Sequence, residues 1–294
     1  MGLGPRTTRV ASGVVHDSPA RRSTVGVRVL VVDGGVAQER PDRLVTEEPM
    51  EIRASGPGQA AAPVTVTMRT PGNDFELAVG FCVSERVVAH PHDIASVAYC
   101  LSGDAPQEYN VVTVTTRTPV DLEVHRRAFV SNSSCGLCGK TTLDQVEAAC
   151  DPIDAAIRVG RSVLVALPDR LREEQAVFDA TGGVHAAALF SASGELQCLR
   201  EDIGRHNALD KVIGWAALAR RVPLSDAVLL VSGRVSFEIV QKAAMAGIPV
   251  ISAVSAPSSL AVQTAARLGI TVAGFLRGDH FNVYSHPERV DLTQ

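Results

Sequence analysis

The chain has 294 residues, enough for two domains with separate cores, and 46% hydrophobic with 20% charged residues is typical of a globular protein. A net charge of −4 excludes bulk attraction to nucleic acid or to anionic membranes, so neither is expected as a partner. The sequence has no run of roughly 20 apolar residues for a membrane span and no signal-peptide segment, and six cysteines are too few for a disulfide framework. We therefore expect a cytoplasmic protein with reduced thiols.

The N-terminal part of the chain is expected to form a small α/β domain over residues 25–120. It follows a lead-in, residues 1–24, whose Arg, Ser, Thr and Gly predict disorder. Apolar patterns predict strands, and Asn73 or Asp74 caps a helix with one apolar stripe. The predicted strands are 25–32, 43–54, 64–69, 94–101 and 111–117, the helix runs from 74 to 82, and the Gly/Pro/Ala-rich residues 55–63 form a turn or insertion.

A mobile linker is expected at residues 121–140, and it carries Cys135 and Cys138, a cysteine pair separated by two residues. A helix is predicted to begin directly after Lys140. The positive end of a helix dipole and a lysine both favour an anion, and a thiolate is such an anion. The pattern therefore predicts lowered thiol pKa values on an accessible loop, which is a setting for thiolate chemistry.

This cysteine pair admits four interpretations: a redox dithiol, half of a zinc site, a sulfur-handling site or an inert pair. A thioredoxin-like oxidoreductase would carry its pair after a strand near the start of a βαβ unit, whereas this pair follows a long polar linker. A zinc-binding interaction module would need two more ligands, which the same loop of a second copy could supply. The other cysteines lie in apolar surroundings and are expected to be small buried hydrophobes: Cys82, Cys100, Cys150 and Cys198.

The rest of the chain, residues 141–294, is predicted to be a larger domain with a three-layer α/β/α architecture. The expected elements are helices at 168–180, 203–220, 236–246 and 257–268, a hairpin of strands 184–190 and 196–200, and strands at 227–231, 248–251 and 270–275. Continuous apolar strands joined by single helices indicate parallel strands with right-handed crossovers, buried on both faces.

Polar loops follow the three predicted parallel strands, at residues 232–234, 255–259 and 276–280. Ligands of such sheets bind at the carboxyl ends of the strands. Glycines, hydroxyls and arginines that meet there beside a helix N-terminus indicate a pocket for a phosphorylated ligand. The sequence leaves open whether four nearby basic residues join this pocket or form salt bridges: Arg200, Arg205, His206 and Lys211.

His185 raises the question of a zinc deaminase, because such enzymes use an H-x-E motif and a later P-C-x-x-C. This chain has Ala187 where the catalytic glutamate would stand, and its cysteine pair lies upstream of the histidine. Deamination is therefore not expected. His185 is either a hydrogen-bonding group of the pocket or a buried histidine whose partners are satisfied.

Five stretches, taken in this order, resemble the formate dehydrogenase accessory sulfurtransferase (FdhD) family. They are TPGNDFELA at 70–78, CGLCG at 135–139, FDATGGVH at 178–185, EDIGRHNALDK at 201–211 and the stretch at 274–287. The resemblance covers nearly the whole chain from about Val25. It implies that the larger domain is cytidine-deaminase-like and lacks the deaminase zinc residues, which agrees with Ala187. The chain departs from the family at Arg86, where relatives often have glycine, and at residues 55–63.

The resemblance also implies a function. Proteins of this family take persulfide sulfur from a cysteine desulfurase and pass it to the molybdenum cofactor, in its bis-guanine-dinucleotide form, for formate dehydrogenase. Cys135 matches the persulfide-bearing position, and the spacing motivates the hypothesis that Cys138 assists release. The guanine-dinucleotide site matches Phe275, Leu276, Arg277, Gly278, Asp279 and His280. Because this cargo has two guanine-nucleotide halves, a homodimer with one half in each protomer is expected.

Overall fold

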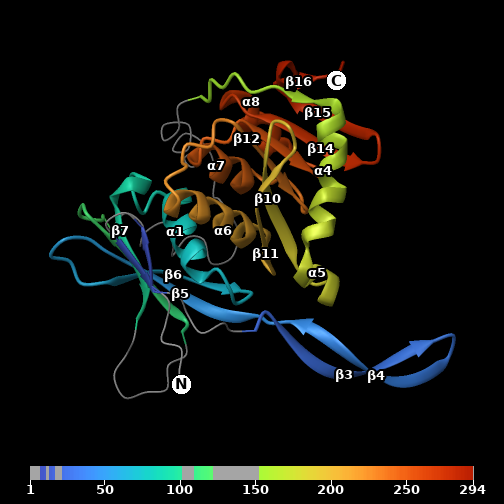
Figure 1. Cartoon of the computed structure of the whole chain (residues 1–294), viewed down its shortest axis with the longest axis horizontal. Coiled ribbons are helices and arrows are strands. Elements are labelled where there is room, and N and C mark those ends of the chain that lie inside the picture. The colour runs from blue at the N-terminus through green and yellow to red at the C-terminus, as the bar shows by residue number, and fades with distance from the viewer. Residues whose placement is uncertain (1–6, 11–12, 17–21, 101–108, 122–151, 294) are drawn as a thin grey trace.

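The computed structural model describes residues 7–10, 13–16, 22–100, 109–121 and 152–293. These residues form two six-stranded sheets, a long two-stranded arm and a pair of short strands, with helices packed between and around the sheets (Figure 1). Within these ranges, no helix has both the length and the apolar character needed to span a membrane.

The first sheet is built from the N-terminal part of the chain, in the order β1-β2-β7-β8-β5-β6. Its strands are β1 (Thr7–Val10), β2 (Gly13–His16), β5 (Glu48–Ser55), β6 (Ala62–Arg69), β7 (Ile94–Tyr99) and β8 (Val111–Thr116). The short helix η1 (Pro91–Asp93) precedes β7. Helix α1 (Asp74–Ser84) lies where Asn73 and Asp74 predicted it, and it buries Leu77 in one cluster with Ile52 and Val112 of the sheet.

The arm consists of β3 (Thr24–Asp33) and β4 (Val36–Val45), which pair antiparallel over their whole length. Gly34 and Gly35 form its turn, and both have the positive φ that favoured two-residue hairpin turns require. The single strand predicted at 43–54 is therefore wrong: β4 ends at Val45, and β5 begins at Glu48 in another sheet. The first part of β4 was not predicted as a strand, because it contains charged residues and Pro41, and both proline and polar residues argue against a strand.

Two further expectations for this part need correction. β1 and β2 lie within residues 1–24, which composition predicted to be disordered, and β2 joins the sheet by pairing with β7 at Val15 and Val97. The turn predicted at 55–63 is shorter, since β5 continues to Ser55 and β6 begins at Ala62. In both places, strand pairing extends further along the chain than the local composition indicated.

The second sheet has the order β11-β10-β12-β13-β14-β15. Its strands are β10 (His185–Ser191), β11 (Leu196–Asp202), β12 (Ala227–Val231), β13 (Val250–Ala253), β14 (Thr271–Arg277) and β15 (His280–Ser285). β12, β13 and β14 are parallel and β10 and β11 form a hairpin, which confirms both predictions. β15, which turns back antiparallel against β14, was not predicted from the sequence.

Helices lie on both faces of the second sheet. On one face, α6 (Arg205–Leu218), α7 (Phe237–Met245) and α8 (Ser259–Arg267) share a buried cluster with Leu229 and Ile251. On the other face, α4 (Arg161–Glu174) shares a second cluster with Leu230. Beyond these layers, β9 (Val159–Gly160) pairs with β16 (Val290–Asp291), which follows the short helix η2 (Pro287–Arg289).

The helix predicted at 168–180 begins earlier and is divided in two. α4 ends at Glu174, and a separate helix α5 (Ala176–Thr181) follows it. Pro168 lies inside α4, although proline in a helix interior costs about 3 kcal/mol. Leu164, Leu167 and Leu171 form a buried stripe on this helix, and their packing against the sheet outweighs that cost.

The two sheets are joined through helices α1 and α6, which cross at two glycines. A Cβ atom on Gly80 would lie 1.7 Å from the carbonyl oxygen of Asp210, and one on Gly214 would lie 1.8 Å from that of Glu76. A single buried cluster contains side chains from both sheets and both helices. Polar contacts across the junction reinforce it: Nζ of Lys242 lies 2.7 Å from a Glu85 carboxylate oxygen, Nζ of Lys211 donates to Thr70 O, and Arg200 donates to Glu76. The division into domains at 25–120 and 141–294 stays a prediction.

Candidate functional site at the carboxyl ends of the parallel strands

The loops that follow β12 and β13 lie together with the last part of β14 at one edge of the second sheet. Backbone hydrogen bonds join them: Val235 N–H donates to Ala256 O (3.2 Å), Ser258 N–H to Val235 O (2.9 Å) and Phe275 N–H to Ser255 O (3.2 Å). Gly274 permits this approach, because a Cβ atom there would lie 3.1 Å from Pro257 Cδ. The convergence predicted from the order of the strands is therefore present.

A cluster of polar groups lies where β12 ends beside the start of β10. Gly233 is the centre of this cluster: a Cβ atom on it would lie 3.4 Å from His185 Nδ1 and 3.5 Å from Arg205 Cδ. The Ser232 hydroxyl accepts a hydrogen bond from Ala186 N–H at 2.9 Å. His185 reaches this edge because β10 is antiparallel to β12, so the first residue of β10 lies at the carboxyl end of β12.

The first turns of α6 and α7 complete the cluster. Nε2 of His206 lies 3.3 Å from the Ser236 hydroxyl and 4.0 Å from a Glu238 carboxylate oxygen. Nε of Arg205 is buried and has no hydrogen-bond partner among the described residues. A buried guanidinium N–H without an acceptor is costly, and an anionic ligand would satisfy it.

Both histidines of the cluster are held neutral. Burial lowers the pKa of His206 to about 4, with the charges of Arg205 and Lys242 adding to the effect. Burial and Arg205 also lower the pKa of His185. Neutral imidazoles can still donate and accept hydrogen bonds, so the cluster offers polar contacts and one half-buried cation, Arg205, whose Nε is buried. This composition suits the binding of an anion. No group of three potential ligands of a metal ion occurs among the described residues.

The residues predicted to hold the nucleotide cargo form the end of β14 and its turn into β15. Phe275 has a positive φ of 58° and is 41% exposed, while Leu276 is buried in the core beside α4. Arg277 and His280 are paired across the hairpin, with Gly278 in the turn at a φ of 54°. An Asp279 carboxylate oxygen lies 3.4 Å from Nη2 of Arg161. Except for Leu276, these residues are exposed.

Two of the four basic residues named from the sequence belong to the scaffold. Nη2 of Arg200 donates to Glu76 of α1 at 2.7 Å, and Nζ of Lys211 lies 2.7 Å from the Asp202 carboxylate and donates to Thr70 O at 2.9 Å. Arg205 and His206 belong to the cluster. Ser236 and Glu238 were not predicted, and the only available signal was their position at the start of the helix that follows the 232–234 loop.

The predicted catalytic cysteines, Cys135 and Cys138, lie outside the described residues, as does Cys150. Cys82 and Cys198 are buried, as expected, and burial raises the pKa of both thiols, that of Cys198 to about 12. Cys100 is only half-buried, which corrects the expectation of a buried hydrophobe there. Its strand, β7, ends one residue earlier, so Cys100 lies at the sheet end and not within the core.

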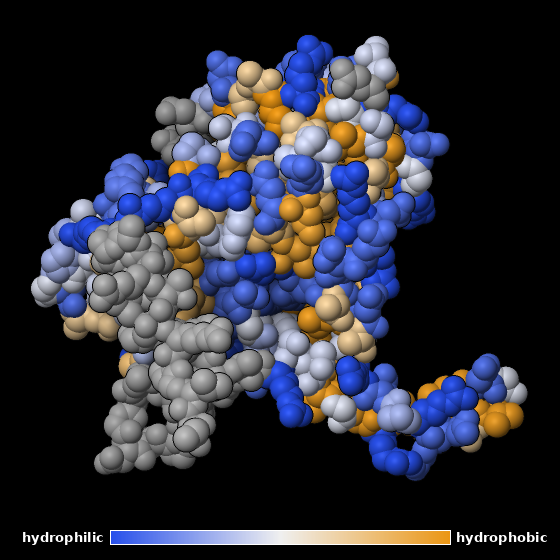
Figure 2. All heavy atoms as spheres, in the orientation of Figure 1, coloured by the Kyte–Doolittle hydropathy of each residue, from blue (hydrophilic) through white to orange (hydrophobic). Residues whose placement is uncertain are grey.

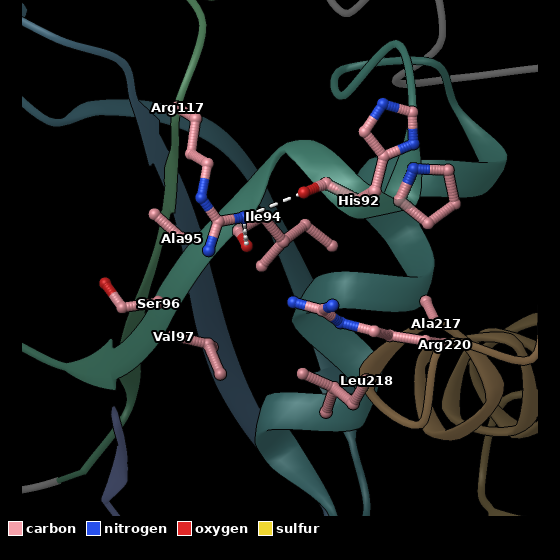
Figure 3. A pocket seen from close by; sticks show the side chains of 10 residues that line it. His92, Ile94, Ala95, Ser96, Val97, Arg117, Ala217, Leu218 and Arg220 are labelled. Atoms are coloured by element: carbon pink, nitrogen blue, oxygen red, sulfur yellow. Dashed lines mark hydrogen bonds between the residues drawn. The ribbon is translucent and has the colours of Figure 1, made fainter. Parts of the chain in front are cut away.

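A shallow hollow lies away from this edge, between η1, β7 and the end of α6 (Figure 3). Arg117 and Arg220 lie on its walls, with Val97 and Leu218 nearby. Arg117 donates from Nη1 to the carbonyl oxygens of His92 (2.8 Å) and Ile94 (2.7 Å), so it fixes the start of β7. None of the predicted site residues lines this hollow.

Comparison with known proteins agrees with this fold. A crystal structure of a candidate formate dehydrogenase accessory protein from Desulfotalea psychrophila matches 92% of this chain and 100% of its own, with a TM-score of 0.72 at 23% identity. The chain therefore has the mixed α/β fold of that protein.

The sequence comparisons identify the family. The FdhD/NarQ family matches residues 45–291. A protein of Streptomyces coelicolor named sulfur carrier protein FdhD is 52% identical over 92% of this chain and 97% of its own length. One from the archaeon Sulfurisphaera tokodaii, with the same name, is 44% identical over 90% of this chain and 98% of its own. The chain belongs to the FdhD/NarQ family.

Proposed function

We propose that this protein is a sulfurtransferase that accepts persulfide sulfur from a cysteine desulfurase and transfers it to the molybdenum cofactor required by formate dehydrogenase. The observation that carries the proposal is the 52% identity over 92% of the chain with a protein named as a sulfur carrier. The cargo is the bis-guanine-dinucleotide form of the cofactor, and the protein works in the cytoplasm.

The choice of the carrier thiol follows from the cysteines. A carrier must present a thiolate to two partners, and burial with a raised pKa disqualifies Cys82 and Cys198. Cys135 lies in a Gly-rich sequence beside Lys140 and ahead of a predicted helix, which favours a thiolate. Cys135 is therefore the proposed persulfide carrier.

The proposed reaction has two steps. The Cys135 thiolate attacks the outer sulfur of the desulfurase persulfide, the donor S–S bond breaks, and the desulfurase cysteine leaves as a thiolate. Cys135 then carries the outer sulfur as its own persulfide. For delivery, the Cys138 thiolate attacks the Cys135 sulfur, which releases hydrosulfide to the metal centre and leaves a disulfide between the two cysteines. A dithiol reductant must return this disulfide to two thiols before the next cycle.

The strand-end cluster is the proposed cargo site. The guanidinium groups of Arg205 and Arg277 would contact phosphate, and Phe275, Gly278, Asp279 and His280 would contact the nucleotide from the β14–β15 hairpin. Leu276 could contribute only its backbone, because its side chain is buried. The larger part of the chain would then be a cytidine-deaminase-like domain that binds a nucleotide and does not catalyse deamination. In the proposed homodimer, each protomer holds one nucleotide half of the cargo.

Intact-protein mass spectrometry tests the carrier role. The wild type, Cys135→Ala and Cys138→Ala are each incubated with cysteine and a cysteine desulfurase, with Cys100→Ala as the matched control. We expect the mass of one added sulfur atom, removable by reductant, on every form except Cys135→Ala. Full multiple-turnover delivery by Cys138→Ala without reductant would remove Cys138 from the scheme.

The alternative functions give different results in the same experiment. A dithiol oxidoreductase takes up no sulfur and needs both cysteines for disulfide exchange. A zinc-binding interaction module takes up no sulfur either and carries metal that is lost in the Cys135→Ala variant. Absence of added sulfur on freshly reduced wild type, with a desulfurase shown to be active in parallel, would overturn the proposed function.

A further inference from the structure

The β3–β4 arm displays apolar side chains that nothing in the described protomer covers. Five of the ten large apolar side chains that are exposed among the described residues lie on it. They are Val25, Leu30, Val32, Val36 and Leu44, with exposed fractions of 48% to 71%. Figure 1 shows the arm extending away from both sheets, and Figure 2 shows apolar surface on it.

The two strands of the arm differ in character. β3 is apolar at nearly every position, with Arg28 as its one charge before Asp33, and such a continuous run is typical of a strand covered on both faces. β4 carries Glu39, Arg40, Asp42 and Arg43 together with Pro41. Charges and proline are the features by which natural proteins block pairing at a sheet edge. The outer edge of β4 is therefore protected and that of β3 is open.

Among the described residues, the contacts that anchor the arm lie at its base. Thr46 N–H donates to Ser23 O at 2.8 Å, and a Cβ atom on Gly183 would lie 3.2 Å from Val45 Cγ1. A two-stranded hairpin without further support is marginally stable in water, whereas three or more strands with an apolar face are stable. An additional strand at the open edge of β3 would supply that support.

We propose that β3 pairs with β3 of a second copy of this chain, which joins two arms into a four-stranded sheet with β4 of each copy on the outside. A twofold contact brings the same surface to both sides and therefore requires a self-complementary surface. The arm meets this requirement, because its three arginines balance its three acidic residues and two arms do not repel each other. Antiparallel pairing of ten-residue strands forms about ten interchain hydrogen bonds, as many as a typical protein interface.

This inference rests on the homodimer of the proposed function and assigns its contact surface. The test compares full-length wild type with the double variant Leu30→Lys/Val32→Lys. Leu30 lies opposite Glu39 in the hairpin register, so a lysine there keeps a favourable cross-strand pair within the arm. The matched control is Val66→Lys/Leu292→Lys, because both residues lie outside the arm and have similar exposed fractions. Val66 is 62% and Leu292 is 70% exposed, compared with 63% for Leu30 and 65% for Val32.

Sedimentation velocity over a range of concentrations should show dimers for the wild type and the control. The arm variant should dissociate with a dissociation constant raised by about 100-fold or more. In hydrogen exchange, amides of β3 should become protected as the wild-type concentration rises, and those of β4 should change less. Sulfur loading on Cys135 should be unchanged in the arm variant, so failure of the carrier role and failure of this contact can be told apart.

An arm variant that dimerises like the wild type would overturn the proposal. A wild type that stays monomeric at all concentrations would also overturn the proposal, whether or not the amides of β3 are protected. Protection of β3 in a monomer would mean that the arm contacts something other than a second copy.

Discussion

Gly80 of α1 and Gly214 of α6 lie against each other where the two helices cross, and each would place a Cβ atom within 1.8 Å of a backbone oxygen of the opposite helix. Backbone cannot rearrange as a flexible side chain can, so neither position tolerates alanine without separating the helices. This contact joins the first sheet to the second.

Gly214→Ala should therefore lower the free energy of unfolding by about 3 kcal/mol or more, through overpacking that no rotamer relieves. Urea denaturation followed by circular dichroism measures it. The matched control is Gly26→Ala, because nothing lies within 4 Å of a Cβ atom at Gly26 and its φ is negative. Equal transition midpoints for Gly214→Ala and the wild type would contradict the close crossing.

Arg86→Gly should stabilise the protein. Arg86 follows α1 with a φ of 58°, in the left-handed region that costs a residue with a side chain about 1–2 kcal/mol. Glycine relieves this strain, but it also raises the conformational entropy of the unfolded chain, which offsets about 0.4–1 kcal/mol of the stabilisation. The net increase, about 0.5–1 kcal/mol, is measurable by thermal unfolding, and Arg86→Lys should leave the midpoint unchanged. Destabilisation by glycine would show that the arginine side chain itself contributes.

The contribution of His206 to the stability of the protein should fall as the pH falls from about 6.5 to about 4, whereas Asp210, whose pKa burial raises to about 6, contributes in the opposite direction. The unfolded His206 takes up its proton near its ordinary pKa of 6.5, whereas the folded side chain does so only at about 4. At His206, the folded state therefore binds fewer protons in this window than the unfolded state does, and this difference lowers stability as the solution becomes more acidic. Because the ring is about one-third exposed, the loss is on the order of 1–2 kcal/mol.

Urea titrations at several pH values check this dependence, and His206→Gln should flatten part of it while it keeps a polar group near Ser236. A variant with the slope of the wild type would assign the dependence to other groups.

Arg205→Gln should weaken the binding of guanosine diphosphate, used as a fragment of the proposed cargo, by about 10-fold to 100-fold. A hydrogen bond to a charged group contributes about 1.5–3 kcal/mol, and each 1.4 kcal/mol is tenfold in affinity. Isothermal titration calorimetry provides the affinities. Arg221→Gln is the control, since Arg221 is exposed and contacts Trp215 at the other end of α6. Equal affinity for Arg205→Gln and the wild type would place the phosphate elsewhere.

The core of the second sheet could be predicted from the sequence because β12, β13 and β14 are predominantly apolar and are joined by single helices. In the arm, the strand predicted at 25–32 corresponds to β3, but most of β4 could not be predicted, because β4 owes its strand conformation to its pairing with β3 and not to its own pattern. Pro168 misled the prediction of α4 for a related reason: tertiary packing of three leucines overrode a local preference.

The site shows the same limit. The loops at the strand ends were predictable from topology, but the roles of Arg205 and Lys211 were not. Six residues place Lys211 roughly 240° around the helix from Arg205, so one side chain faces the ligand edge and the other faces the junction with the first sheet. Arg200 likewise faces Glu76 of α1, which only the packed structure reveals.

The crossing of α1 and α6 also bears on how the protein is made. The two helices are separated by about 120 residues of chain. At a translation rate of about 5–20 residues per second, the ribosome needs roughly 6–24 seconds to make that length. During this interval the apolar stripe of α1 has emerged, while the helix that covers it does not yet exist. The nascent chain therefore offers a chaperone a binding segment at α1, and the first sheet completes its core only after α6 has left the ribosome.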